Sequence, residues 1–256
     1  MLLVPLVTGA VVGRPTGDRI VSVLLLAGVA LGLFCVRTPV EAWLGISPWR
    51  AQNPKERRVI LHSIYIYTSI SAGALGILLW QIRSYGLFLV GAAAATAFLA
   101  QVILKSMGRQ TRMAAQLVGS IGLTATAAAA YYVATGRFDT TAFVIWAANW
   151  VFAVNQIQYV QTRISSAHAA TAGERLTQGR WLILGEISLV AVLTLTWRRG
   201  WLPGLALLAF APVLLRGLTW FFGRTTRLQI RRLGVRELIH AVIFGVLLIV
   251  SFQVRG

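Results

Sequence analysis

The sequence is poor in charged residues and almost free of cysteine. Only 12% of its 256 residues are charged, 57% are hydrophobic, and the mean hydropathy is +0.73. Soluble globular domains carry about 25% charged residues, so this composition excludes an ordinary soluble domain. Cys35 is the single cysteine, which excludes an intrachain disulfide and a metal cage built from cysteines.

Acidic residues are also scarce. Seven Asp and Glu stand against 24 Lys and Arg, giving a formal net charge of +17, and Lys55 and Lys105 are the only lysines. In a soluble protein this excess would indicate nucleic-acid binding. Here the basic residues fall between apolar runs, where they orient helices and meet anionic head groups. We therefore expect membrane lipids, and no nucleic acid, as partners.

The apolar runs predict an all-α fold, a polytopic transmembrane bundle of about nine helices. A spanning helix needs about 20 mostly apolar residues. The runs cover residues 1–13, 20–36, 59–81, 84–104, 114–134, 139–160, 181–197, 201–222 and 237–254. They predict one transmembrane domain over residues 1–256 and no soluble domain.

The first run is too short to span a membrane. Thirteen helical residues cover about 20 Å of a roughly 30 Å hydrocarbon core. We interpret it as a helix whose start is missing. A signal peptide is the alternative, but no basic segment precedes the run and Thr8-Gly9-Ala10 is a poor cleavage site.

The basic residues are distributed unequally between the loops. The loops after the second, fourth, sixth and eighth runs hold 17 of the 24 with Arg216 counted among them, and placing Arg216 within the eighth run does not change the imbalance. The positive-inside rule places these loops and the N-terminus in the cytoplasm and the C-terminus outside. The two longest, 37–58 and 161–180, are then cytoplasmic. Prolines, beginning with Pro39, limit the first of them to short helical pieces.

Ionisable side chains inside spans are costly, so each is a candidate functional group. Glu186 lies about one and a half turns into the seventh run, either protonated and hydrogen-bonded or ionised beside an arginine or a metal. Glu237 and His240 share a face at spacing i, i+3. Three interpretations are open for this pair: an interfacial cap paired with Arg236, a proton relay, or half of a metal site. His62, at the start of the third run, is expected to be an interfacial group rather than a ligand.

The densest polar cluster ends the sixth run. Asn155, Tyr159 and Arg163 follow at i, i+4 and i+8, so they lie on one helix face. An amide, a phenol and a guanidinium in a row suit an anionic head group, because arginine binds phosphate bidentately. The alternative is interhelical hydrogen bonding that only packs the bundle.

The polar candidates share one side of the membrane in the predicted topology, which predicts a pocket that opens toward the cytoplasm. The ligand-binding candidates are Arg37, His62, Lys105, Asn155, Gln158, Tyr159, Arg163, Glu186, Glu237 and His240. The sequence assigns no catalytic residue and no metal ligand.

Four segments spread over nearly the whole chain carry a family resemblance. They are Met1-Leu-Leu-Val-Pro5-Leu-Val-Thr-Gly9, Val36-Arg37-Thr38-Pro39, Tyr159-Val-Gln-Thr-Arg163 and Gly234-Val-Arg-Glu237-Leu-Ile-His240. Together they resemble the YwiC-like family of bacterial integral membrane proteins, which implies a location in the inner membrane. The family pattern begins with His-Gly-Ala-Trp-Ala-Met, and this sequence starts at what would be its Met.

The predicted topology also resembles that of UbiA-type prenyltransferases, which have nine helices and functional loops after the second and sixth. Those enzymes hold Mg²⁺ and a prenyl diphosphate on Asn-Asp-x-x-Asp motifs. Here Asn155 matches, but Gln156 and Tyr159 replace the aspartates, and the loop after the second run offers Arg37 and Glu41. Neutral or basic side chains cannot replace paired carboxylates as Mg²⁺ ligands. We therefore expect no cofactor and no Mg²⁺-dependent transfer.

The favoured function is binding of an isoprenoid or other anionic lipid head group in the cytoplasmic-side pocket of a degenerate prenyltransferase-like protein. Whether such a protein is also a transferase stays open. One alternative is a small proton-coupled transporter that uses Glu186 and His240. Another is an accessory protein of a respiratory chain, in which only His62 and His240 are available as haem ligands.

Overall fold

Ten α-helices and no strand make up the part of the chain that the computed structural model describes, residues 2–45, 53–82, 85–108, 110–167, 171–222 and 229–255. The helices are α1 (Leu3–Gly13), α2 (Asp18–Trp43), α3 (Pro54–Ile82), α4 (Gly86–Ser106), α5 (Arg112–Thr135), α6 (Thr140–Ser165), α7 (Ala172–Gln178), α8 (Arg180–Arg198), α9 (Ala206–Phe222) and α10 (Ile230–Arg255). The predicted all-α helical bundle is confirmed, and each of the nine apolar runs corresponds to one helix. The short α7 is an addition within the segment 161–180.

Six of the described helices are long and apolar enough to cross a membrane, namely α2, α3, α4, α5, α8 and α10. Helices α1 and α9 are apolar but shorter, with 11 and 17 residues. Large apolar side chains cover the outside of the bundle, and Trp80 and Leu89 are 75% and 69% exposed. Such a surface suits lipid and not water. The chain is a multi-pass membrane protein.

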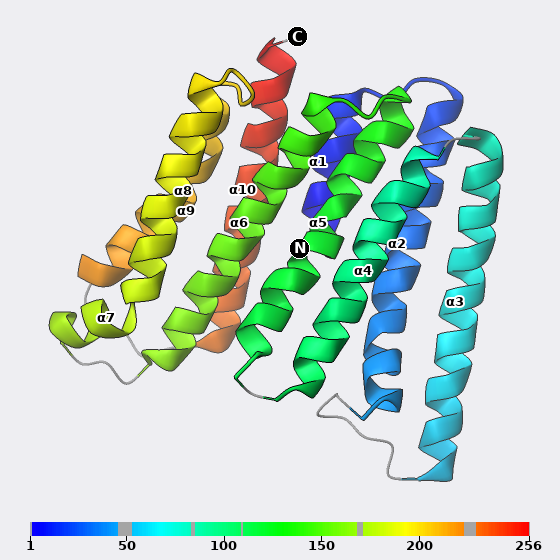
Figure 1. Ribbon diagram of the computed structural model, residues 1–256, viewed down its shortest axis with the longest axis horizontal. Helices are drawn as coiled ribbons and strands as arrows, with labels where there is room; N and C mark the ends of the chain where they lie inside the picture. The colour runs from blue at the N-terminus through cyan, green and yellow to red at the C-terminus, as the bar shows by residue number, and fades with distance from the viewer. Residues whose placement is uncertain are drawn as a thin grey trace.

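The path of the chain separates the two sets of loops. The C-terminal ends of α2, α4, α6 and α9 and the N-terminal ends of α3, α5, α8 and α10 lie together at the lower end of the bundle (Figure 1). We call this lower end the basic end, because the arginine-rich loops of the sequence join these helices. The C-terminus lies at the opposite end, and α1 begins about midway between the two (Figure 1).

Small residues allow the close packing of the N-terminal helices. Helix α5 packs against α1, α2, α4 and α6, and Ala127, Ala128 and Ala130 are fully buried. Gly9 of α1 lies so near the backbone of Ala127 that a Cβ atom would collide with it. Small side chains are the usual means by which membrane helices approach closely.

The C-terminal helices pack through aromatic side chains. Phe244 of α10 stacks on Phe152 of α6 with 4.2 Å between ring centroids and meets Phe210 of α9 edge-on at 5.0 Å. A buried hydrogen bond of 3.1 Å from Asn149 Nδ2 to Thr8 Oγ1 joins α6 to α1. These contacts fix α6, α9 and α10 relative to each other and to the N-terminal helices.

The predicted start of the first long loop, at residue 37, is wrong. Helix α2 continues through Pro39 to Trp43. A proline removes one backbone hydrogen bond but need not end a membrane helix, where neighbouring groups satisfy the freed carbonyl. An ion pair one turn apart, from Arg37 Nε to Glu41 Oε1 at 3.0 Å, supports this last part of the helix. Residues 46–52 of the predicted loop lie outside the described residues.

Candidate functional site

Arg216 lies at the centre of a buried polar cluster that joins three helices. It is a residue of α9, within the predicted apolar run 201–222 and not in the loop that follows, and it is only 7% exposed. Its Nη2 donates to Oδ1 of Asn155 at 2.9 Å, and its Nη1 forms an ion pair with Oε2 of Glu237. Its guanidinium lies over the ring of Tyr159, with 4.4 Å to the centroid. One side chain thereby connects α9 to α6 and α10.

Helix α6 presents its polar row to this arginine. Asn155 and Tyr159 are both buried, and neither faces lipid. One turn further, the guanidinium carbon of Arg163 lies 6.0 Å from the ring centroid of Trp220 on α9. The i, i+4, i+8 spacing places all three side chains toward α9, as the helical period requires.

Glu186 of α8 completes the cluster from a fourth helix. It is 9% exposed, and its carboxylate fills the space beside Gly217 of α9, where a Cβ atom would collide with it. Within the described part of the chain its Oε1 has no hydrogen-bond partner. Arg216 is close enough to Glu186 for the two side chains to interact electrostatically when Glu186 is ionised. The carboxyl groups of two residues, Glu186 and Glu237, therefore lie close to one buried arginine.

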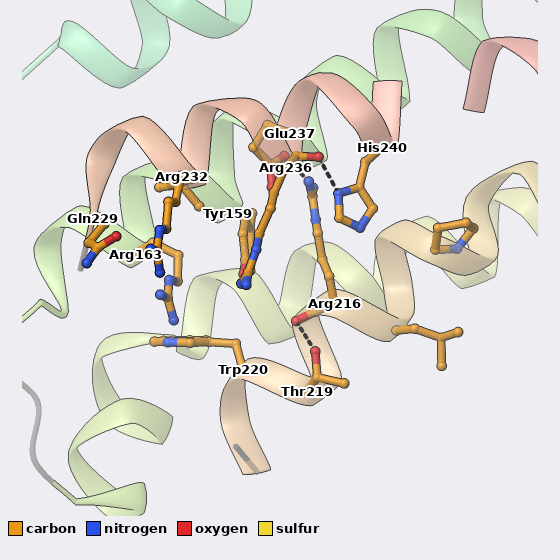
Figure 2. A pocket seen from close by; sticks show the side chains of 13 residues that line it. Tyr159, Arg163, Arg216, Thr219, Trp220, Gln229, Arg232, Arg236, Glu237 and His240 are labelled. Atoms are coloured by element: carbon orange, nitrogen blue, oxygen red, sulfur yellow. Dashed lines mark hydrogen bonds and ion pairs between the residues drawn. The ribbon is translucent and has the colours of Figure 1, made fainter. Parts of the chain in front are cut away.

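A pocket of about 800 Å³ opens beside this cluster, between α6, α9 and α10. We call it the arginine pocket; its polar and aromatic lining comprises Tyr159, Arg163, Arg216, Thr219, Trp220, Gln229, Arg232, Arg236, Glu237 and His240. Figure 2 shows the side chains of α10 and of Arg163 gathered on one side of the pocket, with Trp220 on the other.

The arginine pocket holds more positive charge than its own carboxylate can neutralise. Glu237 is its one acidic lining residue, and it is already paired with Arg216. Arg163, Arg232 and Arg236 form no ion pair with any described residue. Three guanidinium groups are thus available to an anion in the pocket.

The expected pairing of Glu237 with Arg236 is wrong, since Glu237 bonds Arg216. Arg236 contributes its backbone instead, and its carbonyl oxygen accepts a hydrogen bond of 2.7 Å from Nδ1 of His240. Because a carbonyl can only accept, Nδ1 carries the proton, and Nε2 is the remaining polar atom of the ring. His240 therefore lines the pocket with its Nδ1 held by the backbone of its own helix.

The structure brings together six of the ten predicted candidates, Asn155, Tyr159, Arg163, Glu186, Glu237 and His240, around Arg216. The others lie elsewhere. Gln158 packs against Gly185 of α8 and does not line the pocket. His62 is exposed on α3, which packs against α2. The ten candidates therefore do not share one pocket.

Arg37 and Lys105 meet at a separate carboxylate. Oε1 of Glu41 accepts from Arg37 Nε at 3.0 Å and from Lys105 Nζ at 2.6 Å. This network ties α2 to α4 at the basic end, and Arg37 also lines a second pocket. Both basic residues thus have a structural partner away from the arginine pocket.

The residues in place of a magnesium motif do not fit a Mg²⁺ ion. Asn155 Oδ1 and the ring of Tyr159 face the guanidinium of Arg216, and Gln156 Nε2 donates to the backbone oxygen of Glu237 at 3.0 Å. A divalent cation here would meet a buried positive charge in place of paired carboxylates. Nor do the described residues include any group of three His, Cys, Asp or Glu side chains placed to hold a metal.

Sequence reasoning passed over Arg216 and Arg232 as site residues. A signal for Arg216 was present, since it is the only charged residue in the apolar run 201–222 and a charge within a span needs a partner. Arg232 and Arg236 are spaced i, i+4, which places them on one helix face. That spacing becomes informative only once the helix is known to begin before them, at Ile230.

The comparisons with known proteins give one match. No curated protein and no solved structure matches the chain. The family model described as YwiC-like protein matches residues 1–131, more than half of the 256 residues. This stretch contains α1 to α4 and most of α5, whereas the arginine pocket lies in the later helices. On the strength of that match, the chain belongs to the YwiC-like protein family.

Proposed function

We propose that the arginine pocket binds the phosphate head group of an anionic lipid. The observation that carries this proposal is the excess of positive charge, since four arginines line a pocket with a single carboxylate, and only Arg216 is paired with it. Guanidinium groups match phosphate oxygens in planar, bidentate hydrogen bonds, which makes arginine the preferred residue for phosphate. A phosphate would also relieve the repulsion between these arginines.

The pocket contains groups for the lipid chain as well as for the head. Trp220 is buried in its lining, and Pro212, Leu215 and Leu233 add apolar surface. Leu215 is exposed on the outside of α9, where lipid surrounds the bundle. A chain attached to a bound phosphate can therefore pass from the pocket into the bilayer. A soluble anion would leave this apolar surface unused.

The resemblance to UbiA-type prenyltransferases makes an isoprenoid phosphate the first lipid to test. Binding, and not Mg²⁺-dependent transfer, suits the residues at Asn155, Gln156 and Tyr159. The proposal includes the orientation in which the basic end faces the cytoplasm of a bacterial inner membrane. Its support is the positive-inside rule.

A titration in nanodiscs with farnesyl phosphate tests the proposal. Arg232→Gln removes one pocket guanidinium, and the exposed Arg231, which does not line the pocket, gives the matched control Arg231→Gln. Hydrogen bonds to charged groups contribute about 1.5–3 kcal/mol, so Arg232→Gln should weaken binding about tenfold or more. Arg231→Gln should change the affinity less than about twofold.

Inorganic phosphate separates a lipid head group from a free anion. It should bind at least about tenfold more weakly than farnesyl phosphate, because it lacks the chain. Equal affinities would identify a soluble anion as the ligand and contradict the lipid proposal. Equal effects of the two arginine variants would contradict the assignment of the pocket.

A proton-coupled transporter is the second candidate, because the buried Glu186 keeps one oxygen without a hydrogen bond beside the Arg216–Glu237 pair. Such a protein would move Arg216 between the two carboxylates as one of them takes up a proton. Proteoliposomes with an internal pH dye distinguish the two functions. Proton uptake that Glu186→Gln abolishes would favour transport over lipid binding.

A further inference from the structure

A second cavity, of about 520 Å³, lies between α4, α5, α6 and α10. We call it the amide pocket, because its polar lining is dominated by Gln101, Gln116, Gln156 and Gln161, joined by Ser120 and Arg37. Leu233 and Glu237 of α10 line both this cavity and the arginine pocket, so the two lie on opposite sides of one turn of α10. Its volume is in the range of pockets for small organic ligands.

The amide pocket has no uncompensated charge. Its charged lining residues are Arg37 and Glu237, and each has a partner within the protein, Glu41 and Arg216 respectively. The other lining residues are amides, one hydroxyl and apolar or small side chains. An ion would therefore find no counter-charge here, which favours an uncharged ligand.

The amide of Gln156 has one polar atom left over. Its side chain is 4% exposed, and Nε2 donates to the backbone oxygen of Glu237 at 3.0 Å. A carbonyl oxygen can only accept, so the nitrogen must face it and the remaining atom must be Oε1. No described residue donates to Oε1. A buried acceptor without a donor is costly, so the ligand should supply an O–H or N–H group.

The rim of the amide pocket includes apolar side chains that are exposed on the outside of the bundle. Ile164 of α6 and Ile230 and Leu238 of α10 line it and are all exposed. Leu238 lies about two turns into α10, so this exposed apolar side offers the chain of a ligand a way into the bilayer. The features of the rim and of Gln156 together describe an amphiphile with an uncharged, hydrogen-bond-donating head.

We propose that the amide pocket is a second binding site, for an uncharged amphiphile whose hydroxyl group donates a hydrogen bond to Oε1 of Gln156. This site does not depend on what the arginine pocket binds. Its ligand differs in charge and its residues differ, apart from the shared turn of α10.

Photolabelling of the full chain in nanodiscs tests the second site. The probes are a twelve-carbon primary alcohol with a diazirine in its chain and the methyl ether of the same compound, which cannot donate a hydrogen bond. The alcohol should label peptides of α5, α6 and α10 with about three- to tenfold higher apparent affinity than the ether, the effect of one uncharged hydrogen bond. Equal labelling by the two probes, or labelling outside these helices, would overturn the proposal.

Two variants and a control locate the hydrogen bond. Gln156→Met keeps the length of the side chain and should remove the preference for the alcohol. Gln158→Met is the matched control on the same helix, since Gln158 faces α8, and it should keep the preference. If Gln156→Met does not fold, Leu123→Phe fills part of the pocket from α5 with Gln156 unchanged and should reduce labelling by both probes at least fivefold. Undiminished labelling of Gln156→Met or of Leu123→Phe by the alcohol would contradict the site.

The arginine pocket is excluded by a third variant. Arg232→Gln should leave alcohol labelling unchanged while it weakens farnesyl phosphate. If Arg232→Gln weakened both alcohol labelling and the binding of farnesyl phosphate, the alcohol would lie in the arginine pocket and the second site would be overturned. If it weakened neither, the result would count against the phosphate site alone.

Discussion

Arg216 of α9 and Glu237 of α10 form a buried ion pair, and their side chains are only 6% and 8% exposed. Breaking such a pair leaves the remaining charge buried without a partner, at a cost of about 3–5 kcal/mol. Arg216→Gln should therefore lower the free energy of unfolding by about this amount, measured by denaturation of the purified protein in detergent. Adding Glu237→Gln should recover part of the loss. If the double variant is as unstable as the sum of the two single ones, the pair does not couple the helices.

A methyl group at Gly217 should force the carboxyl end of Glu186 to move out of its buried position. In most helix interiors Gly→Ala stabilises by about 1 kcal/mol, but a Cβ atom at Gly217 would collide with the carboxylate of Glu186. We expect Gly217→Ala to lower the melting temperature and Glu186→Ala to relieve that loss in the double variant. Gly73 of α3 has open space around its Cβ position, so Gly73→Ala is the control and should be neutral or stabilising. A neutral Gly217→Ala would show that the packing of α8 on α9 is looser than described.

Arg163→Lys tests the geometry of phosphate recognition separately from charge. Lysine keeps the positive charge but lacks the planar fork of the guanidinium. We expect the affinity for farnesyl phosphate to fall about tenfold while its dependence on salt stays the same, measured by titration at two ionic strengths. An unchanged affinity would mean that Arg163 contributes charge alone.

Removal of divalent metal should leave phosphate binding intact. Asn155, Gln156 and Tyr159 offer no carboxylate, and the nearby cation is Arg216 itself. Titration of farnesyl phosphate with and without EDTA should give the same affinity within about twofold. Strong dependence on Mg²⁺ would show that Glu41, Glu186 or Glu237 supplies ligands.

Hydropathy located the helices, but it did not show where a helix continues into polar residues beyond its apolar segment. Helix α10 begins at Ile230, seven residues before the predicted 237, because Arg231, Arg232 and Arg236 continue the helix beyond its apolar part. Helix α7 follows a capping box in which Thr171 and Glu174 bond each other's backbone N–H groups, a signal that the pattern T-x-x-E carries in the sequence.

The part of the site that follows from the period of a single helix was predictable, and the part that depends on contacts between helices was not. The i, i+4, i+8 row of Asn155, Tyr159 and Arg163 needs only the helical period, and the structure places it on one face. The position of Arg216 depends on how α9 packs against α6 and α10, which periodicity does not contain. The unpartnered oxygen of Gln156 follows from a bond to the backbone of a helix 81 positions away, so no local pattern could indicate it.

The most direct test of the phosphate site is the distance between lipid phosphorus and arginine nitrogen. Protein labelled with ¹⁵N in its arginines would be held in dodecyl maltoside, which contains no phosphate, and loaded with one equivalent of farnesyl phosphate. Solid-state NMR should then show ³¹P–¹⁵N dipolar dephasing that Arg232→Gln reduces and Arg231→Gln leaves intact. Dephasing that is absent, or that both variants reduce equally, would contradict binding of a phosphate head group in the arginine pocket.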